Sequence, residues 1–177
     1  MNYRIKYDSI PLMVKSTEVL VGAPVKATED APKVETKDCI FCKIVEGKAR
    51  SIRVAEDDYS VSFMSLEGHP VVAPRRHIEG LPELNEATED RQRALVFANR
   101  ILPAVLAEYE ERFGATGIKL QANMGASAGQ DVMHFHVHLI PRRNLDGQVG
   151  GKDVRIGDHA VKTTVALGIK TRLPGAA

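Results

Sequence analysis

Residues 134–141 read His-Phe-His-Val-His-Leu-Ile-Pro, and the alternation of polar and apolar side chains predicts a β-strand. Successive side chains of a strand point to opposite faces, so His134, His136 and His138 share one face while apolar residues line the other. Imidazole can act as a nucleophile, a general acid or a metal ligand near neutral pH. We therefore expect the histidine face to lie at the centre of a functional site.

The segments around this strand favour a sheet. A glycine-bracketed loop at residues 125–129, Gly-Ala-Ser-Ala-Gly, can bring backbone N–H groups close to a ligand. A hairpin is expected around Gly68. The strands that we expect span residues 59–64, 70–73, 117–124 and 133–140, with a further one at residues 12–21.

A long helix is predicted at residues 88–113, where apolar side chains recur every three or four residues. Thr88 is expected to be its N-cap and Gly114 to end it. Pro103 removes one backbone donor, so we expect the helix to kink or split there. A helix combined with antiparallel strands indicates the α+β class.

The length and charge of the chain exclude several classes of protein. A chain of 177 residues argues for one domain with extensions, and 24 Lys plus Arg against 23 Asp plus Glu disfavours a protein that coats nucleic acid or an anionic membrane. The apolar runs are too short to span a membrane, and the first 20 residues carry no secretory signal pattern, so we expect a cytoplasmic protein. The basic residues of the C-terminal part are Arg142, Arg143, Lys152, Arg155, Lys162, Lys170 and Arg172, and a solvated face is the simpler interpretation of them.

The two cysteines, Cys39 and Cys42, form a Cys-x-x-Cys pair. Such a pair fits a redox site, half of a zinc site or two buried small side chains. The redox interpretation lacks the parallel βαβ setting in which it usually occurs. A tetrahedral zinc would need two further ligands, and His77 and one histidine of the triad are available.

Four ordered blocks resemble the histidine triad (HIT) superfamily of nucleotide hydrolases and transferases. They are residues 39–47, which contain the cysteine pair; residues 71–77, Val-Val-Ala-Pro-Arg-Arg-His; residues 123–130, Asn-Met-Gly-Ala-Ser-Ala-Gly-Gln; and residues 134–142, which contain the triad. The resemblance implies a five-stranded antiparallel sheet with one long and one short helix, usually in a homodimer joined through the long helix and the sheet edges. It also implies an N-terminal extension or arm at residues 1–38, a HIT domain at 39–142, and a C-terminal extension at 143–177 that packs on the domain or on the dimer partner.

The resemblance implies that His136 attacks the α-phosphorus of a nucleotide and forms a nucleotidyl-histidine intermediate, which water then hydrolyses. A backbone carbonyl would hold one ring nitrogen of His136, and His138 and His69 would flank the phosphate. The implied substrate-binding residues are Asn123, Gly129, Gln130, Asp131, Ser65 and Leu66.

Similar transferases commonly carry glutamine at the third triad position, where this chain has His138, so hydrolysis is favoured. The expected activity releases a nucleoside 5'-monophosphate, AMP or GMP, from an amine, acyl, phosphate or nucleotide leaving group. Two alternatives stay open: a nucleotide-binding regulatory module with little turnover, and a nucleotidyltransferase. A nucleic-acid partner is disfavoured because the chain has no Trp and only 5% aromatic residues.

Zinc-containing members of the family use residues that correspond to Cys39, Cys42, His77 and His134. The resemblance therefore implies a structural zinc ion, and the chemistry itself requires no metal.

The sequence departs from the family pattern next to the second strand. Ser65 stands where an acidic residue usually contacts the ribose, and the loop before His69 is a few residues shorter. Glu67 could substitute for the missing acid, and Asp131 replaces a small hydroxyl residue near the leaving group. We therefore expect an altered substrate preference.

Overall fold

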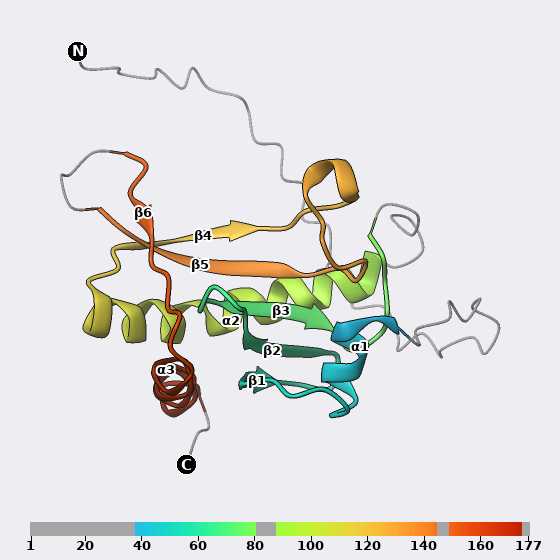
Figure 1. The fold of residues 1–177 in the computed structure, drawn as a ribbon, viewed down its shortest axis with the longest axis horizontal. Helices are drawn as coiled ribbons and strands as arrows, with labels where there is room; N and C mark the ends of the chain where they lie inside the picture. The colour runs from blue at the N-terminus through green and yellow to red at the C-terminus, as the bar shows by residue number, and fades with distance from the viewer. Residues whose placement is uncertain (1–37, 81–87, 145–148, 175–177) are drawn as a thin grey trace, which may run out of the picture. The chain divides into compact units, whose positions relative to one another are not determined.

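The computed structural model describes residues 38–80, 88–144 and 149–174, all of which belong to one compact unit (Figure 1). The strand that we expected at residues 12–21 lies outside the described residues. Within the described ranges, no helix is both long enough and apolar enough to cross a membrane.

The central feature is an antiparallel sheet in the order β1-β2-β3-β5-β4 (Figure 1). A short strand, β6, pairs with the end of β5, and neither β6 nor β1 was among the strands predicted from the sequence. The predicted α+β class and antiparallel sheet are confirmed. The strands are β1 (Arg53–Glu56), β2 (Ser60–Met64), β3 (Pro70–Pro74), β4 (Gly117–Gln121), β5 (Val137–Arg143) and β6 (Lys152–Asp153).

The helices are α1 (Ile40–Val45), α2 (Thr88–Phe113) and α3 (His159–Thr171), with a 3₁₀ turn at Ala126–Ala128. Helix α2 has the predicted bounds, and Thr88 is its first residue rather than a cap outside it. The expectation at Pro103 was a kink or a split, and the helix runs unbroken through this residue, so it is not split there. Pro103 is exposed, while Ile101 and Val105 on either side of it are buried, so packing of the opposite face offsets the lost backbone bond.

Helix α3 was not predicted, and two sequence signals could have indicated it. Asp158 is an N-cap whose side chain accepts a hydrogen bond from the N–H of Val161 at 2.8 Å. Val165 and Ile169 then follow at helical spacing and are fully buried. The helix packs against α2 and β1, so part of the C-terminal extension belongs to the folded unit.

The two faces of the sheet carry different cores. A large cluster beneath α2 contains Phe135, Val137 and Leu139 together with the buried face of α3. A smaller cluster on the other face joins Ile44 of α1 to β2 and β3. Since side chains alternate, the histidines between these three apolar residues lie on the α1 side of the sheet.

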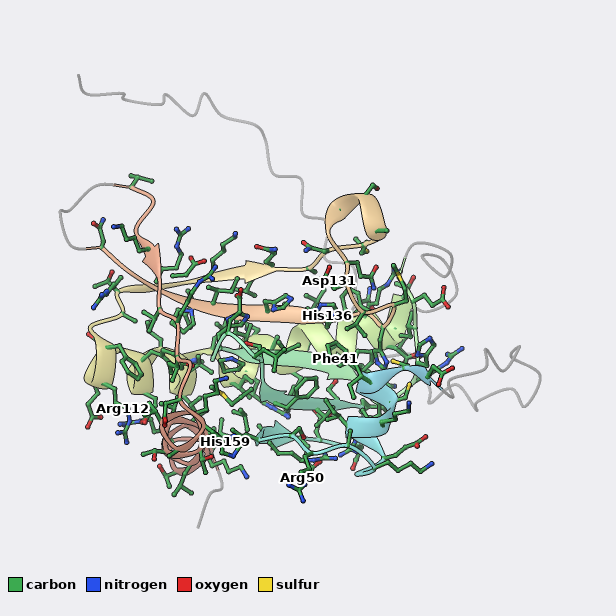
Figure 2. All side chains as sticks on the ribbon, viewed as in Figure 1. Phe41, Arg50, Arg112, Asp131, His136 and His159 are labelled. Carbon is green, nitrogen blue, oxygen red and sulfur yellow. The ribbon has the colours of Figure 1, made fainter. Side chains whose placement is uncertain are left out.

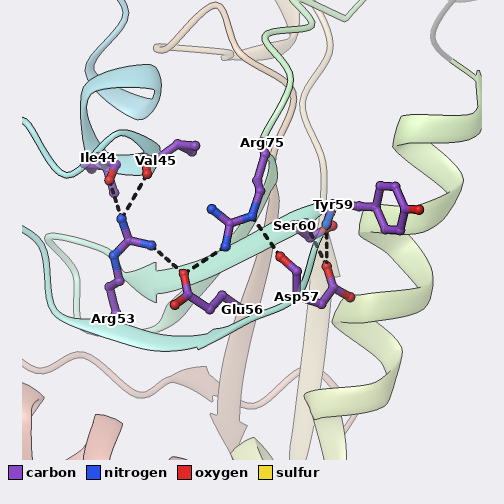
Figure 3. A network of polar contacts seen from close by, with 8 residues as sticks. All are labelled: Ile44, Val45, Arg53, Glu56, Asp57, Tyr59, Ser60 and Arg75. Carbon is purple, nitrogen blue, oxygen red and sulfur yellow. Dashed lines mark hydrogen bonds and ion pairs between the residues drawn. The ribbon is translucent and has the colours of Figure 1, made fainter. Parts of the chain in front are cut away.

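A polar network fastens the C-terminal end of α1 to the first hairpin (Figure 3). The Arg53 guanidinium donates to the carbonyl oxygens of Ile44 and Val45 at 2.6 and 3.1 Å and to Glu56 at 2.7 Å. Arg75 donates to the same Glu56 carboxylate at 3.0 Å. The last carbonyls of α1, which lack partners within the helix, are satisfied in this way.

Candidate functional site

His136 is held in one tautomer by its own backbone. Its Nδ1 lies 2.7 Å from the carbonyl oxygen of His134, an oxygen that can only accept, so Nδ1 carries the proton and Nε2 presents a lone pair. The side chain is 5% exposed, and burial lowers the pKa of its imidazole below the usual value, so the ring stays neutral near pH 7. A neutral imidazole with one fixed nitrogen is prepared for nucleophilic attack.

The imidazoles of His69 and His138 contact each other beside the ring of His136. His69 Nε2 lies 2.9 Å from His138 Nδ1, and the rings of His136 and His138 have centroids 4.8 Å apart. Burial, followed by the charge of His138, lowers the pKa of His69 to about 4. The two histidines expected to flank the phosphate therefore lie in contact with each other and next to the ring of His136.

The loop before the triad is built around Gln130. Its Oε1 accepts from the N–H of Gly125 at 2.7 Å, and its Nε2 donates to the carbonyl oxygens of Glu79 and Val132 at 2.7 and 3.1 Å. The residue is 3% exposed, so its amide is occupied in holding the loop instead of facing a ligand. Asn123 donates to the carbonyl oxygen of Gly129 at 3.0 Å and closes the same loop.

The residues expected near the nucleoside occupy less enclosed positions. Ser65 Oγ accepts from the N–H of His69 at 3.2 Å and so fixes the turn that carries this histidine. Leu66 is 94% exposed, and Asp131 is exposed close to His136 (Figure 2). Glu67, the possible substitute acid, places a carboxylate oxygen 3.9 Å from His69 Nδ1.

Phe41 is a site residue that the sequence interpretation missed. Its ring stands at 90° to the ring of His136 with centroids 5.1 Å apart, and it also contacts Phe63 edge-on at 5.1 Å (Figure 2). The residue lies between the two cysteines, so its place in the Cys-x-x-Cys block was a usable signal.

The turn that carries His69 is held by hydrogen bonds from α2 and from the segment after β5. Tyr109 of α2 donates its hydroxyl to the carbonyl oxygen of Gly68, which has a φ of 86°. The N–H of Ile156 donates to the carbonyl oxygen of Glu67 at 2.9 Å, and Lys162 Nζ donates to that of Leu66 at 2.7 Å. The segment after β5 therefore helps to position the turn.

A second cluster joins Cys39 and Cys42 to two histidines. One ligand atom from each of Cys39, Cys42, His77 and His134 lies within 4.8 Å of the others. His134 Nδ1 is 3.5 Å from both sulfurs, and Cys42 Sγ is 3.2 Å from His77 Nδ1. These four residues are close enough to bind a metal ion, and Cys₂His₂ is a donor set that suits tetrahedral zinc.

The surroundings of this cluster fit a cation. His134 Nε2 lies 2.9 Å from the carbonyl oxygen of Pro74, which leaves Nδ1 free of its proton and directed at the sulfurs. Burial, followed by a hydrogen bond and the charge of Cys39, raises the pKa of the Cys42 thiol to about 12. Two thiolates crowded together, with that of Cys42 buried, are unfavourable by themselves, and a divalent ion would remove that penalty.

The HIT domain family matches residues 46–145 of the chain. The chain therefore belongs to the HIT family, as the triad and its neighbouring blocks indicated.

Curated relatives and solved structures agree with this assignment. The chain is 33% identical over 133 residues to an adenosine 5'-monophosphoramidase of Saccharomyces cerevisiae, a match that covers 72% of this chain and 78% of the relative. It is 30% identical over 113 residues to an adenylylsulfatase of Arabidopsis thaliana, covering 62% and 54%. Among solved structures, a zinc-bound histidine triad family protein from Mycobacterium smegmatis superposes with a TM-score of 0.57 at 25% identity, covering 75% of this chain and 93% of that one. The family thus includes hydrolases of small nucleotides and a zinc-bound protein of the same fold.

Proposed function

We propose that this protein hydrolyses small nucleotides and releases a nucleoside 5'-monophosphate, AMP or GMP, from an amine, acyl, phosphate or nucleotide leaving group. The observation that carries the proposal is the 2.7 Å contact between His136 Nδ1 and the carbonyl oxygen of His134, which leaves Nε2 free to attack. The named activities of the two hydrolase relatives support the same reaction class.

In the first step, His136 Nε2 forms a bond to the α-phosphorus while the bond from phosphorus to the leaving group breaks. His69 Nε2 is proposed to donate its hydrogen to His138 Nδ1, so that the Nε2–H of His138 binds a phosphate oxygen and then supplies the proton that the leaving group takes. In the second step, water attacks the phosphorus and returns a proton to His138, the bond to His136 Nε2 breaks, and the nucleoside monophosphate leaves. Both steps depend chiefly on positioning and on stabilising charge at the phosphate.

The loop at residues 125–129 is proposed to hold the phosphate with its backbone N–H groups, with Asn123 and Gly129 at its base. Gln130 acts by positioning this loop, since its own amide bonds three backbone groups. Ser65, Leu66 and Asp131 are proposed to border the nucleoside and the leaving group. Because Ser65 cannot make the charge-assisted contact of a carboxylate, we expect only a small difference between substrates with and without ribose hydroxyls.

The test compares the wild-type chain with His136→Ala and with Asp58→Ala, a control at an exposed position between β1 and β2. Each is incubated with adenosine and guanosine phosphoramidates, adenosine 5'-phosphosulfate and diadenosine polyphosphate. We expect release of nucleoside monophosphate by wild type and control, and a loss of roughly 10⁴-fold or more in kcat for His136→Ala. Tight nucleotide binding by the wild type without turnover would instead favour the regulatory module, and transfer of the nucleotide to an added phosphate acceptor would favour a nucleotidyltransferase.

We also propose that the Cys39, Cys42, His77 and His134 cluster holds a structural zinc ion. Elemental analysis of the purified protein should give about one zinc per chain, and removal with a chelator should lower the melting temperature. Cys42→Ser should lose the zinc, while Ser51→Ala, a small hydroxyl change outside the cluster, should keep it. A purified protein that contains no stoichiometric zinc and is as stable as before chelation would contradict the assignment.

Metal-bound thiolates suit a reducing compartment, and on that ground we propose a cytoplasmic location.

A homodimer joined through α2 and the sheet edges is proposed for the same protein. Leu95 and Val96 of α2 are 45% and 68% exposed, and Leu120 on the edge strand β4 is 46% exposed, which supports a covered surface in the assembly. Light scattering after gel filtration should give twice the chain mass, and a mass of one chain would refute the dimer.

A further inference from the structure

A cavity of about 660 Å³ opens between α3, the end of β2 and the segment that leads into β1. Five of its lining side chains are basic or imidazole groups: Arg50, Arg53, His159, Lys162 and Lys170. None of the described residues that line it is acidic. Glu56 pairs with Arg53 at 2.7 Å, so the charge of Arg53 is already compensated. A chain with a formal net charge of only +1 therefore concentrates positive charge around one hollow.

Helix α3 presents a continuous stripe of residues to this cavity. His159, Lys162, Ala166 and Lys170 follow one another at intervals of three or four, which places them on one helical face. The cations stand at the two ends of the stripe, and its middle is apolar. Leu167, next to Ala166, is 60% exposed and lines the same hollow. The cavity thus offers an apolar surface between two groups of cations.

The cavity lies on the opposite side of the sheet from the triad. Met64 and Ala166, which line it, belong to the core cluster beneath α2. His138 pairs across the sheet with Val71, which belongs to the cluster on the α1 side. Figure 2 shows His159 on α3 and Arg50 next to β1, both apart from His136. Ser65 and Leu66 of the turn that carries His69 also line the cavity, so a ligand here would adjoin the proposed nucleoside border but leave the face that carries the triad open.

We propose that this cavity is a second binding site, and that its ligand is an organic polyphosphate, a polyanion attached to an apolar body. The volume falls within the range of pockets that enclose small ligands. Lys and Arg are the side chains that bind phosphate oxygens, and the described residues contain no carboxylate paired with Arg50 or Lys170. Lys162 donates one hydrogen to the Leu66 carbonyl and keeps two for a ligand. This proposal does not depend on the hydrolase activity.

The experiment uses the full chain with His136→Ala, so that turnover cannot consume the probe. ATP is titrated into ¹⁵N-labelled protein, and affinity is measured by calorimetry at two salt concentrations. We expect chemical-shift changes in α3 and at residues 50–53, and weaker binding at higher salt. Arg50→Glu combined with Lys170→Glu should weaken this binding at least tenfold. The matched control, Lys119→Glu with Arg143→Glu, makes the same charge change at the β4–β5 side of the sheet and should leave it within twofold.

Inorganic triphosphate serves as the second probe and separates charge from shape. It should bind the same residues at least fivefold more weakly than ATP, because it cannot use the apolar middle of the stripe. Equal affinity for the two probes would overturn the assignment to an organic ligand. Shift changes confined to the loop at residues 125–130 and the triad would overturn the second site altogether. Because the mapping is carried out without the pocket substitutions, it decides the question even if the charge-reversed variant fails to fold.

Discussion

His69 couples the candidate site to the stability of the fold. The side chain is 2% exposed, and its pKa of about 4 in the folded chain lies below the value of about 6.5 expected when the chain is unfolded. Between these two values the unfolded chain binds more protons than the folded one. The contribution of His69 to stability is therefore complete above pH 6.5 and is lost as the pH falls toward 4, by at most about 1.4 kcal/mol per pH unit.

Urea denaturation from pH 7 to pH 4.5 tests this expectation. The free energy of unfolding of His69→Gln should fall less steeply across this range than that of the wild type, because one buried neutral imidazole has been removed. His159→Gln, at an exposed position of α3, should follow the wild-type profile. Parallel profiles for wild type and His69→Gln would show that the proton uptake occurs elsewhere.

The residues of the site were predictable to different degrees. Alternation in residues 134–141 correctly placed the histidines on the face opposite Phe135, Val137 and Leu139. It could not show that Gln130 faces inward, since its three partners are backbone groups, one of them 51 residues away in the sequence. Phe41 likewise reaches His136 only through the packing of α1 on the sheet.

At the scale of elements, the contact between α2 and α3 depends on one glycine. A Cβ atom on Gly168 would overlap the carboxylate of Glu108, which is 1% exposed and pairs with Arg112 and with Arg172, the latter at 3.1 Å. Alanine would favour the helix by up to about 1 kcal/mol, but forced overlap in a packed interior costs about 1–3 kcal/mol. The overlap should win because the carboxylate is held by two guanidinium groups.

Gly168→Ala is therefore expected to lower the free energy of unfolding by about 1–2 kcal/mol. Gly157→Ala is the matched control, because a Cβ atom there meets nothing within 4 Å. Chemical denaturation of the two variants measures the difference. Equal stability of both would mean that α3 shifts to accommodate the methyl group.

The boundaries of an element could be predicted from local periodicity only where its backbone hydrogen bonds stay within that element. Helix α2 has the predicted bounds, because each turn repeats the same buried face. Strand β5 was predicted from residue 133 but begins at Val137, since the N–H of Phe135 donates to the carbonyl oxygen of Ile78 at 2.5 Å, outside the sheet ladder. Helix α3 was not predicted because basic residues are interspersed among its apolar ones, and they obscure the periodicity of its buried face.

At the scale of the whole molecule, the C-terminal helix is part of the main core. Val165, Ala166 and Ile169 belong to the same cluster as Phe97 and Ile101 of α2. Fully burying such side chains contributes roughly 1.5–3 kcal/mol each, against a typical total stability of about 5–15 kcal/mol. A chain that ends after residue 157 should therefore lack a stable folded state near room temperature, and its melting curve should show no cooperative transition.

A point substitution gives a graded version of this prediction. Ile169→Ala should cost about 2–5 kcal/mol, whereas Leu167→Ala, at a side chain that is 60% exposed, should change stability by less than about 0.5 kcal/mol. Thermal melts followed by circular dichroism distinguish the two. A truncated chain that melts as sharply as the full one would show that the helix is dispensable.

His134 takes part in two sites at once. Its imidazole faces the cysteines, and its carbonyl oxygen holds the proton of the His136 ring. Disturbing the sulfur cluster would move this carbonyl and alter the ring that it orients. If a chelator stopped turnover in an inhibitor screen, the cause would therefore be the lost constraint on the His134 carbonyl. The dose response would resemble that of an enzyme with a catalytic metal, although the metal takes no part in the chemistry.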